Sequence, residues 1–196
     1  MLDNLRPGCL PISDIARSLS LTNRFHGSTM FPYSVAQHCL AVSEILEVAG
    51  HEPAAALHGL LHDAEEALYG DIPRPLKAHL PADLRERMRE ARHFLMRDFG
   101  MPFPRFLHER LVKEADLWCL FAERRVLQPK STGWWGNEHD RPAEWIAHAL
   151  GVEPPETYGA VPCLPPVFEE PWRRVENAFL ETYHRLRDHI ELRNEP

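Results

Sequence analysis

The chain has 196 residues and a formal net charge of −7, and 44% of its residues are hydrophobic and 26% charged. These values are ordinary for a globular domain, so the composition indicates neither a disordered chain nor a membrane protein. The acidic balance, without any block rich in Lys and Arg, argues against binding to a nucleic-acid polymer.

Membrane insertion and secretion are not predicted either. No uninterrupted apolar stretch reaches the roughly 18–20 residues that a membrane helix needs, and the N-terminal MLDNLRPGCLP does not read as a secretion signal. The four cysteines form no C-x-x-C pair, which favours free thiols over disulfides or a zinc knuckle. We therefore predict a cytoplasmic protein.

Helical periodicity begins near the N-terminus. Ser13 is a candidate cap for a helix over roughly 14–23. Ser34, with Gln37 three residues later, forms a capping-box signature for a helix over roughly 35–49, and a glycine follows at the position where helices commonly end. The first fifty residues therefore predict two helices joined by a loop.

A third helix is predicted from Pro53, which suits a first helical turn, to about Tyr69, with Gly70 ending it. The prolines at 73, 75 and 81 predict an extended segment after it. Further helices are expected over 82–99, 105–127 and 171–193, and a short one around 142–150.

Period-two alternation typical of strands is not evident, so the fold class predicted is all-α, a compact bundle of about six or seven helices. No repeat or domain boundary interrupts it, and we expect a single domain over 1–196. Residues 129–170, rich in proline and tryptophan, are predicted to form an irregular surface segment.

Ionisable residues in apolar surroundings suggest a metal site. His62 and Asp63 are adjacent within an apolar run, and two other helices offer His38 and Asp116. An aspartate beside apolar residues is costly to bury unless a cation or hydrogen bonds compensate it. Two imidazoles and two carboxylates suit one divalent transition metal ion, namely Mn²⁺, Co²⁺, Fe²⁺, Ni²⁺ or Zn²⁺, better than Ca²⁺.

The order of these residues carries a family resemblance. The segments SVAQH at 34–38, LLHDAEEALYGDIPRPLK at 60–77 and EADLW at 114–118 resemble the HD-domain metal-dependent phosphohydrolases. The likeness is closest to the compact bacterial 5′-deoxynucleotidases and related phage dNTP triphosphohydrolases, and it covers roughly residues 12–128. It implies an HD-domain helical bundle that forms a homodimer or a higher homo-oligomer.

The resemblance also implies roles for individual residues. His38, His62, Asp63 and Asp116 would ligate the metal, and Asp71 would bind a sugar hydroxyl. Arg24 matches the family's position for an arginine that contacts the phosphate, and Lys77 is a further candidate for a phosphate contact. Phe25 stands where relatives carry a tryptophan beside the sugar.

Glu66 is the candidate catalytic residue. It stands four residues after His62, one turn along the same face of the predicted helix, so it could orient water or act as general acid or base. His58 is expected to pack or to support a ligand, and Glu65 is expected to face solvent. Arg24 could instead be a charge that favours a helix C-terminus.

Together with these residues, the resemblance implies metal-dependent hydrolysis of deoxynucleoside 5′-monophosphates to deoxynucleoside and phosphate. The first alternative is a dNTP triphosphohydrolase, which would need more cations than Lys77, Arg74 and His79 supply. A sensor that binds a nucleotide or metal without turnover is an alternative of another class. A two-iron HD oxygenase is a third, and it would recruit His58 and His26 as additional ligands.

Overall fold

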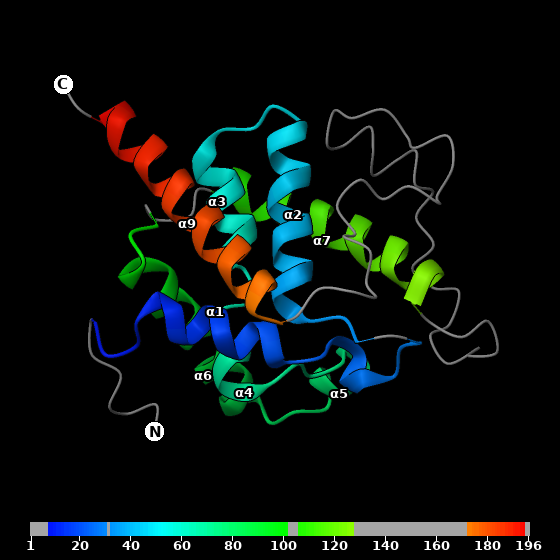
Figure 1. Cartoon of the computed structure of the whole chain (residues 1–196). Coiled ribbons are helices and arrows are strands. Elements are labelled where there is room, and N and C mark those ends of the chain that lie inside the picture. Colours follow the sequence, from blue (N-terminus) through cyan, green and yellow to red (C-terminus); the bar gives the residue numbers. More distant parts are fainter. Residues whose placement is uncertain (1–7, 31, 102–105, 128–171, 195–196) are drawn as a thin grey trace.

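The computed structural model describes residues 8–30, 32–101, 106–127 and 172–194. Within these ranges the chain is all-helical and has no β-strand, which confirms the predicted compact helical bundle (Figure 1). The longer helices are α1 (Ile12–Leu21), α2 (Val35–Val48), α3 (Pro53–Leu61), α6 (Ala82–Asp98), α7 (Phe106–Leu127) and α9 (Trp172–Asn194). The shorter elements are η2 (Arg24–Gly27), α4 (Glu66–Tyr69) and α5 (Arg74–Lys77).

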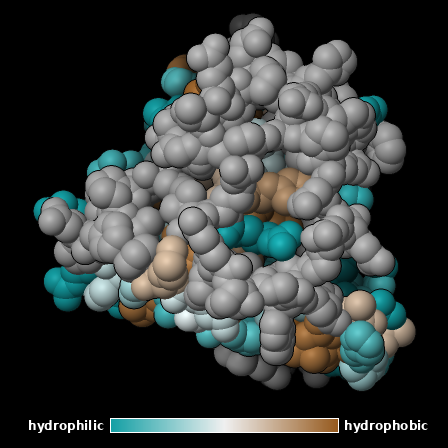
Figure 2. Space-filling view, turned by 90° about the vertical axis from the view of Figure 1, so that its right-hand side faces the viewer, coloured by the Kyte–Doolittle hydropathy of each residue, from teal (hydrophilic) through white to brown (hydrophobic). Residues whose placement is uncertain are grey.

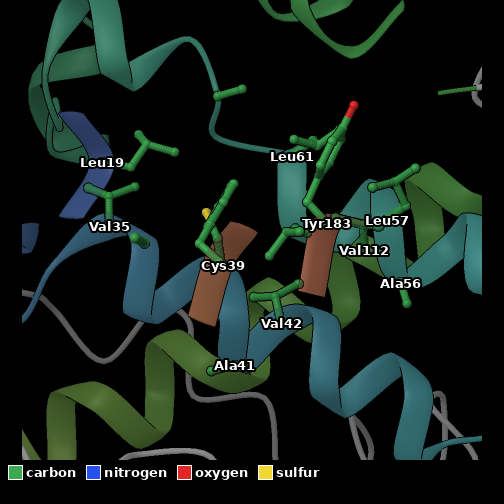
Figure 3. Close-up of a cluster of buried hydrophobic side chains, with 14 of the residues drawn as sticks. Leu19, Val35, Cys39, Ala41, Val42, Ala56, Leu57, Leu61, Val112 and Tyr183 are labelled. Carbon is green, nitrogen blue, oxygen red and sulfur yellow. The ribbon is translucent and has the colours of Figure 1, made fainter. Parts of the chain in front are cut away.

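The hydrophobic core lies between α2, α3, α7 and α9. Helices α2 and α3 pack against each other and against both α7 and α9, while α1 packs across α2 and α9. Figure 1 shows α2, α3 and α9 side by side, with α1 crossing near their lower ends. Figure 3 shows Val42 of α2 facing the same apolar cluster as Leu57 and Leu61 of α3 and Tyr183 of α9. Burial of these apolar side chains supplies the main stabilisation of the bundle.

The contact between α2 and α3 is unusually close at Gly59. A Cβ atom at this position would lie 2.8 Å from Leu46 Cδ1 and 3.2 Å from Val42 Cγ1. Only glycine therefore fits without a shift of these buried neighbours. The close approach holds the C-terminal end of α3 against α2.

The predicted start of α2 is confirmed. The Ser34 hydroxyl accepts a hydrogen bond from the backbone N–H of Gln37, and the Gln37 side chain accepts one from the backbone N–H of Ser34. This capping box satisfies two of the N–H groups that a helix start leaves unpaired. The helix ends at Val48, and Gly50 follows with a φ of 76°. The box fixes where the first turns of α2 lie.

The start of α1 differs from the prediction. The helix begins at Ile12 with Pro11 in the cap position, so Ser13 lies inside the helix and the prediction that it caps the helix is wrong. The carbonyl of Pro11 accepts hydrogen bonds from the backbone N–H groups of Asp14 and Ile15. Proline readily adopts the extended dihedrals that a cap residue needs, which moves the boundary upstream.

The predicted continuous helix from Pro53 to Tyr69 is also wrong, because α3 ends at Leu61 and α4 begins at Glu66. His62 Nδ1 donates a 2.7 Å hydrogen bond to the carbonyl of Gly59. In a continuing α-helix this carbonyl would accept a hydrogen bond from the backbone N–H of Asp63. The backbone then tightens into i to i+3 hydrogen bonds across residues 61–66. His62 and Asp63 therefore lie at a helix break.

The segment after Gly70 is not wholly extended, contrary to the prediction, because α5 forms within it. Its proline at position 75 stands in the first turn, where a missing N–H costs little. The C-terminal helix is present as predicted, while the segment 129–170 and the short helix around 142–150 lie outside the described residues. No disulfide joins the three described cysteines, Cys9, Cys39 and Cys119, to one another.

None of the described helices is long and apolar enough to cross a membrane. The face shown in Figure 2 is the right-hand side of Figure 1, and at its centre hydrophilic residues lie directly beside hydrophobic ones.

Candidate metal centre

Three long helices bring the four predicted metal ligands together. His38 lies near the start of α2, His62 and Asp63 at the end of α3, and Asp116 in the middle of α7. His38 Nε2 is 3.3 Å from His62 Nε2 and 3.2 Å from Asp116 Oδ1, and His62 Nε2 is 3.2 Å from Asp63 Oδ2. The ligand atoms of His38, His62 and Asp116 lie within 4.8 Å of one another, so this group could hold a metal ion.

The two imidazoles are held with their Nε2 atoms facing each other. His62 Nδ1 bonds the Gly59 carbonyl, which can only accept, so this nitrogen carries the proton. His38 Nδ1 lies 2.7 Å from Glu123 Oε1, and an ionised carboxylate likewise only accepts. In neutral imidazoles the lone pairs are therefore on the two Nε2 atoms, where a metal ion can bind them.

The two histidines are more deeply buried than the two aspartates. His38 is fully buried and His62 nearly so, while the side chains of Asp63 and Asp116 are 15% and 20% exposed. Burial would raise the pKa values of both aspartates, but the neighbouring histidines lower them. Burial would lower the pKa of His62, but Asp63 raises it well above the usual value. The carboxylates are thus ionised at the open side of the site.

Glu66 lies beside this group as the first residue of α4. Burial raises the pKa of Glu66 well above its usual value, and the charges of Asp63 and Asp71 raise it further. Glu66 Oε1 is 3.5 Å from Lys77 Nζ, whereas the buried Oε2 has no hydrogen-bond partner among the described residues. A buried carboxyl that resists ionisation can hold or transfer a proton near neutral pH.

Arg24 reaches the site from η2, but its closest partner is a residue that the sequence analysis did not identify. Its Nε and Nη2 atoms are each 3.0 Å from Glu123 Oε2, and its Nη1 is 3.8 Å from Asp63 Oδ2. Burial opposes the charge of Arg24, but Glu123 and Asp63 raise its pKa further above the usual value. Arg24 is therefore a buried cation at the edge of the candidate metal group, which consists of His38, His62, Asp63 and Asp116.

Glu123 could have been found from its spacing. It follows Asp116 by seven residues, which is close to two helical turns, so both carboxylates lie on the same face of α7. Burial would raise the pKa of Glu123, but Arg24 and His38 lower it.

Phe25 lies against Arg24 and is buried in a small apolar cluster. It is buried with Tyr33 and Leu127, and the Arg24 guanidinium lies 5.3 Å from its ring centroid. Phe25 and His26 have positive φ angles of 56° and 52°, which side chains other than glycine rarely adopt. The strained turn and the aromatic ring hold the backbone that presents Arg24.

Cys39 offers a second grouping that the sequence analysis did not propose. Its thiol, His62 and Asp63 also have ligand atoms within 4.8 Å of one another. Burial raises the pKa of the Cys39 thiol, which disfavours the thiolate that binds metals. The group of His38, His62 and Asp116 is therefore the better candidate for a hard or borderline ion.

The predictions for two neighbours of the motif, Glu65 and His58, have different outcomes. Glu65 is fully buried and forms an ion pair with Arg92 at 3.3 Å, so the prediction that it faces solvent is wrong. The break after α3 turns it inward toward α6. His58 is buried as expected, and burial together with the neighbouring His62 lowers its pKa to about 3.

Comparison with known proteins gives one extended match. The chain is 35% identical to "Uncharacterized protein YfdR" of Escherichia coli (strain K12) over 158 residues, which cover 80% of this chain and 83% of that protein. The chain belongs to the YfdR family.

A second relative matches about half of the chain. "Uncharacterized protein RCAP_rcc00048" of Rhodobacter capsulatus is 37% identical over 103 residues, or 49% of this chain and 51% of that protein. The names of these two relatives assign no activity to the YfdR family, and no protein-family model matches the chain.

Proposed function

We propose that the chain is an HD-domain phosphohydrolase that uses one divalent transition metal ion to hydrolyse deoxynucleoside 5′-monophosphates in the cytoplasm. The observation that carries the proposal is the pairing of two imidazole Nε2 atoms, 3.3 Å apart, with an aspartate oxygen on each. Lone pairs that face each other at this distance repel unless a cation or proton lies between them.

The donor set fits such an ion in both charge and chemistry. Four carboxylates face two cations here, so the group is net negative even with Glu66 protonated: Asp63, Asp71, Asp116 and Glu123 against Arg24 and Lys77. Mixed nitrogen and oxygen ligands suit Mn²⁺, Fe²⁺, Co²⁺, Ni²⁺ or Zn²⁺. His38, His62, Asp63 and Asp116 would hold the ion, which supplies Lewis-acid activation of the phosphate ester and of water.

The remaining residues have separate tasks in the proposed reaction. Arg24 neutralises negative charge on the phosphate, and the raised pKa of Glu66 lets this carboxyl exchange a proton with water or with the leaving oxygen. Lys77, 3.5 Å from Glu66, keeps that carboxyl close to the site. Asp71 is half-buried and near enough to Glu66 and Arg24 to shift their pKa values, which is consistent with a contact to a sugar hydroxyl.

The charge near the site favours a single phosphate over a triphosphate. Arg24 is paired with Glu123 and Lys77 with Glu66, while His79 is exposed. A triphosphate would bring several more negative charges, which the described side chains at the site do not balance. The dNTP triphosphohydrolase therefore stands as the alternative to be tested.

The test is a panel of deoxynucleoside monophosphates and triphosphates, assayed with Co²⁺ or Mn²⁺ and with EDTA. We expect release of inorganic phosphate from the monophosphates and none after chelation. Dominant release of triphosphate from dNTPs would replace the proposed substrate by the alternative. Tight nucleotide binding without turnover, unchanged in Glu66→Ala, would instead support a sensor.

The proposed assembly is a homodimer or a higher homo-oligomer. Light scattering coupled to size-exclusion chromatography measures the mass directly, and a monomer at micromolar concentration would contradict this part of the proposal.

A further inference from the structure

One buried carboxylate contacts both the candidate metal group and the candidate phosphate-binding arginine. Glu123 is only 1% exposed, and its two oxygens have different partners. Oε1 accepts the 2.7 Å hydrogen bond from His38 Nδ1, and Oε2 accepts the two 3.0 Å contacts from Arg24 Nε and Nη2. Neither the YfdR family match nor the motif residues assign a role to Glu123.

We propose that Glu123 is a positioning residue that couples metal binding to phosphate binding. With Oε1 it holds His38 in the form whose Nε2 faces the metal group. With Oε2 it occupies one edge of the Arg24 guanidinium, so that the remaining Nη1 points toward Asp63 and the site. This inference rests on the proposed metal-dependent function of the same site.

Only a carboxylate can perform both tasks at this position. An ionised carboxylate accepts hydrogen bonds on both oxygens, whereas an amide accepts on one side and donates on the other. In Glu123→Gln the amide NH₂ would face either His38 Nδ1–H or the Arg24 donors, and two donors cannot bond each other. The substitution keeps the shape of the side chain, but either it breaks one of the two contacts or His38 must carry its proton on Nε2, the atom that faces the candidate metal group.

A purely structural role for Glu123 makes a different prediction. If Glu123 only balanced the buried charge of Arg24, a folded variant without it would bind metal as the wild type does. The decisive readout is therefore metal affinity in the folded protein, independent of turnover. Partners that orient a metal-ligating histidine typically contribute ~10–100-fold to metal affinity.

The experiment titrates metal-free full-length protein with Co²⁺ and follows the visible absorption of the bound ion. We expect Glu123→Gln to weaken Co²⁺ affinity by ~10–100-fold, and at saturating Co²⁺ to weaken binding of inorganic phosphate as well. Glu176→Gln is the matched control, because Glu176 is also buried and paired with an arginine, Arg17, but lies on α9, which supplies no site residue. The control should bind Co²⁺ and phosphate as the wild type does.

A second pair of variants covers the case in which Glu123→Gln does not fold because it leaves the charge of Arg24 uncompensated. Arg24→Gln is compared with Arg24→Gln/Glu123→Gln, in which that charge is absent from both proteins. The double variant should still bind Co²⁺ more weakly than the single one, because only it loses the contact to His38.

Equal Co²⁺ affinity within either folded pair would overturn the coupling role. Failure of the wild type itself to bind Co²⁺ would instead overturn the proposed metal-dependent function, so the two failures are distinguishable.

Discussion

The same helices build two regions with opposite requirements. Where α2 meets α3 and α9, apolar side chains pack so closely that Gly59 leaves no room for a methyl group. Where the start of α2 and the end of α3 meet α7, histidines and carboxylates gather with a surplus of negative charge. The first region is arranged for stability, whereas the second accepts the cost of burying ionisable groups, which a bound cation would reduce.

The largest expected effect follows from removing a candidate metal ligand where α2 and α3 meet α7, which is the polar region of the comparison. Asp116→Asn keeps the size of the side chain but weakens a carboxylate ligand that lies 3.2 Å from His38 Nε2. We expect turnover to fall by at least ~10⁴-fold, since Lewis-acid activation contributes several kcal/mol. Co²⁺ affinity, measured by titration, should fall with it. Turnover within tenfold of the wild type would show that the polar region is not a metal centre.

The next effect separates function from stability at Glu66. Glu66→Gln should reduce turnover by ~10²–10⁴-fold, because a general acid or base is lost. The same change should raise the free energy of unfolding of the metal-free protein at pH 7. The raised pKa of Glu66 means that the folded state disfavours the ionised carboxylate. The contribution of Glu66 to the free energy of unfolding is therefore lost as the pH rises, and a neutral glutamine, which cannot ionise, avoids this loss.

Urea unfolding in EDTA, beside a turnover assay, measures both effects of Glu66→Gln. A variant that is less stable and equally active would contradict the distinction drawn between the two regions.

A substitution where α2 packs against α3 should have the opposite effects to Glu66→Gln, with lower stability and nearly unchanged turnover. Gly59→Ala places a methyl group within 3.3 Å of Val42 Cγ1, Leu46 Cδ1 and the Ser43 backbone. We expect it to destabilise the protein by about 1–3 kcal/mol through overpacking, despite the better helix propensity of alanine. Turnover per folded molecule should stay near that of the wild type. Thermal unfolding checks the first expectation, and a gain in stability would show that α2 and α3 separate easily.

The smallest effect concerns His58, which lies between the two regions. Its pKa is lowered from 6.5 to about 3, so below pH 6.5 the unfolded chain takes up a proton that the folded protein does not. Stability should therefore fall as the pH drops from 6.5 toward 3, by about 2 kcal/mol at pH 5 from this residue.

The His58 prediction is checked by urea unfolding in EDTA at pH 7 and pH 5. His58→Gln should reduce the difference in stability between the two pH values, whereas substitution of the exposed His189 should not. An unchanged difference in His58→Gln would show that His58 is accessible to protons in the folded state.

Local sequence signals predicted the parts of the fold that depend on neighbouring residues. The capping box at Ser34 and Gln37 placed the start of α2 because both of its hydrogen bonds form within four residues. The break between α3 and α4 was not predictable from periodicity. It depends on a side chain, His62, taking the Gly59 carbonyl that the backbone would otherwise use.

The candidate site shows the same division. The four candidate ligands were predicted from their order along the chain. The ligand atoms of His38, His62 and Asp116 lie within 4.8 Å of one another, and Asp63 Oδ2 lies 3.2 Å from His62 Nε2. The inward position of Glu65 and the Arg24 to Glu123 pair depend on how α6, α7 and η2 meet, which no local pattern encodes. Only the spacing of seven residues from Asp116 to Glu123 carried information about that pair.

Diffraction from a crystal soaked in Co²⁺, with data collected at the cobalt absorption edge, tests the central claim most directly. The account predicts one anomalous peak per chain, at about 2.0–2.2 Å from His38 Nε2, His62 Nε2 and carboxylate oxygens of Asp63 and Asp116. No peak in this group, or a peak bound through Cys39 and away from His38, would contradict it.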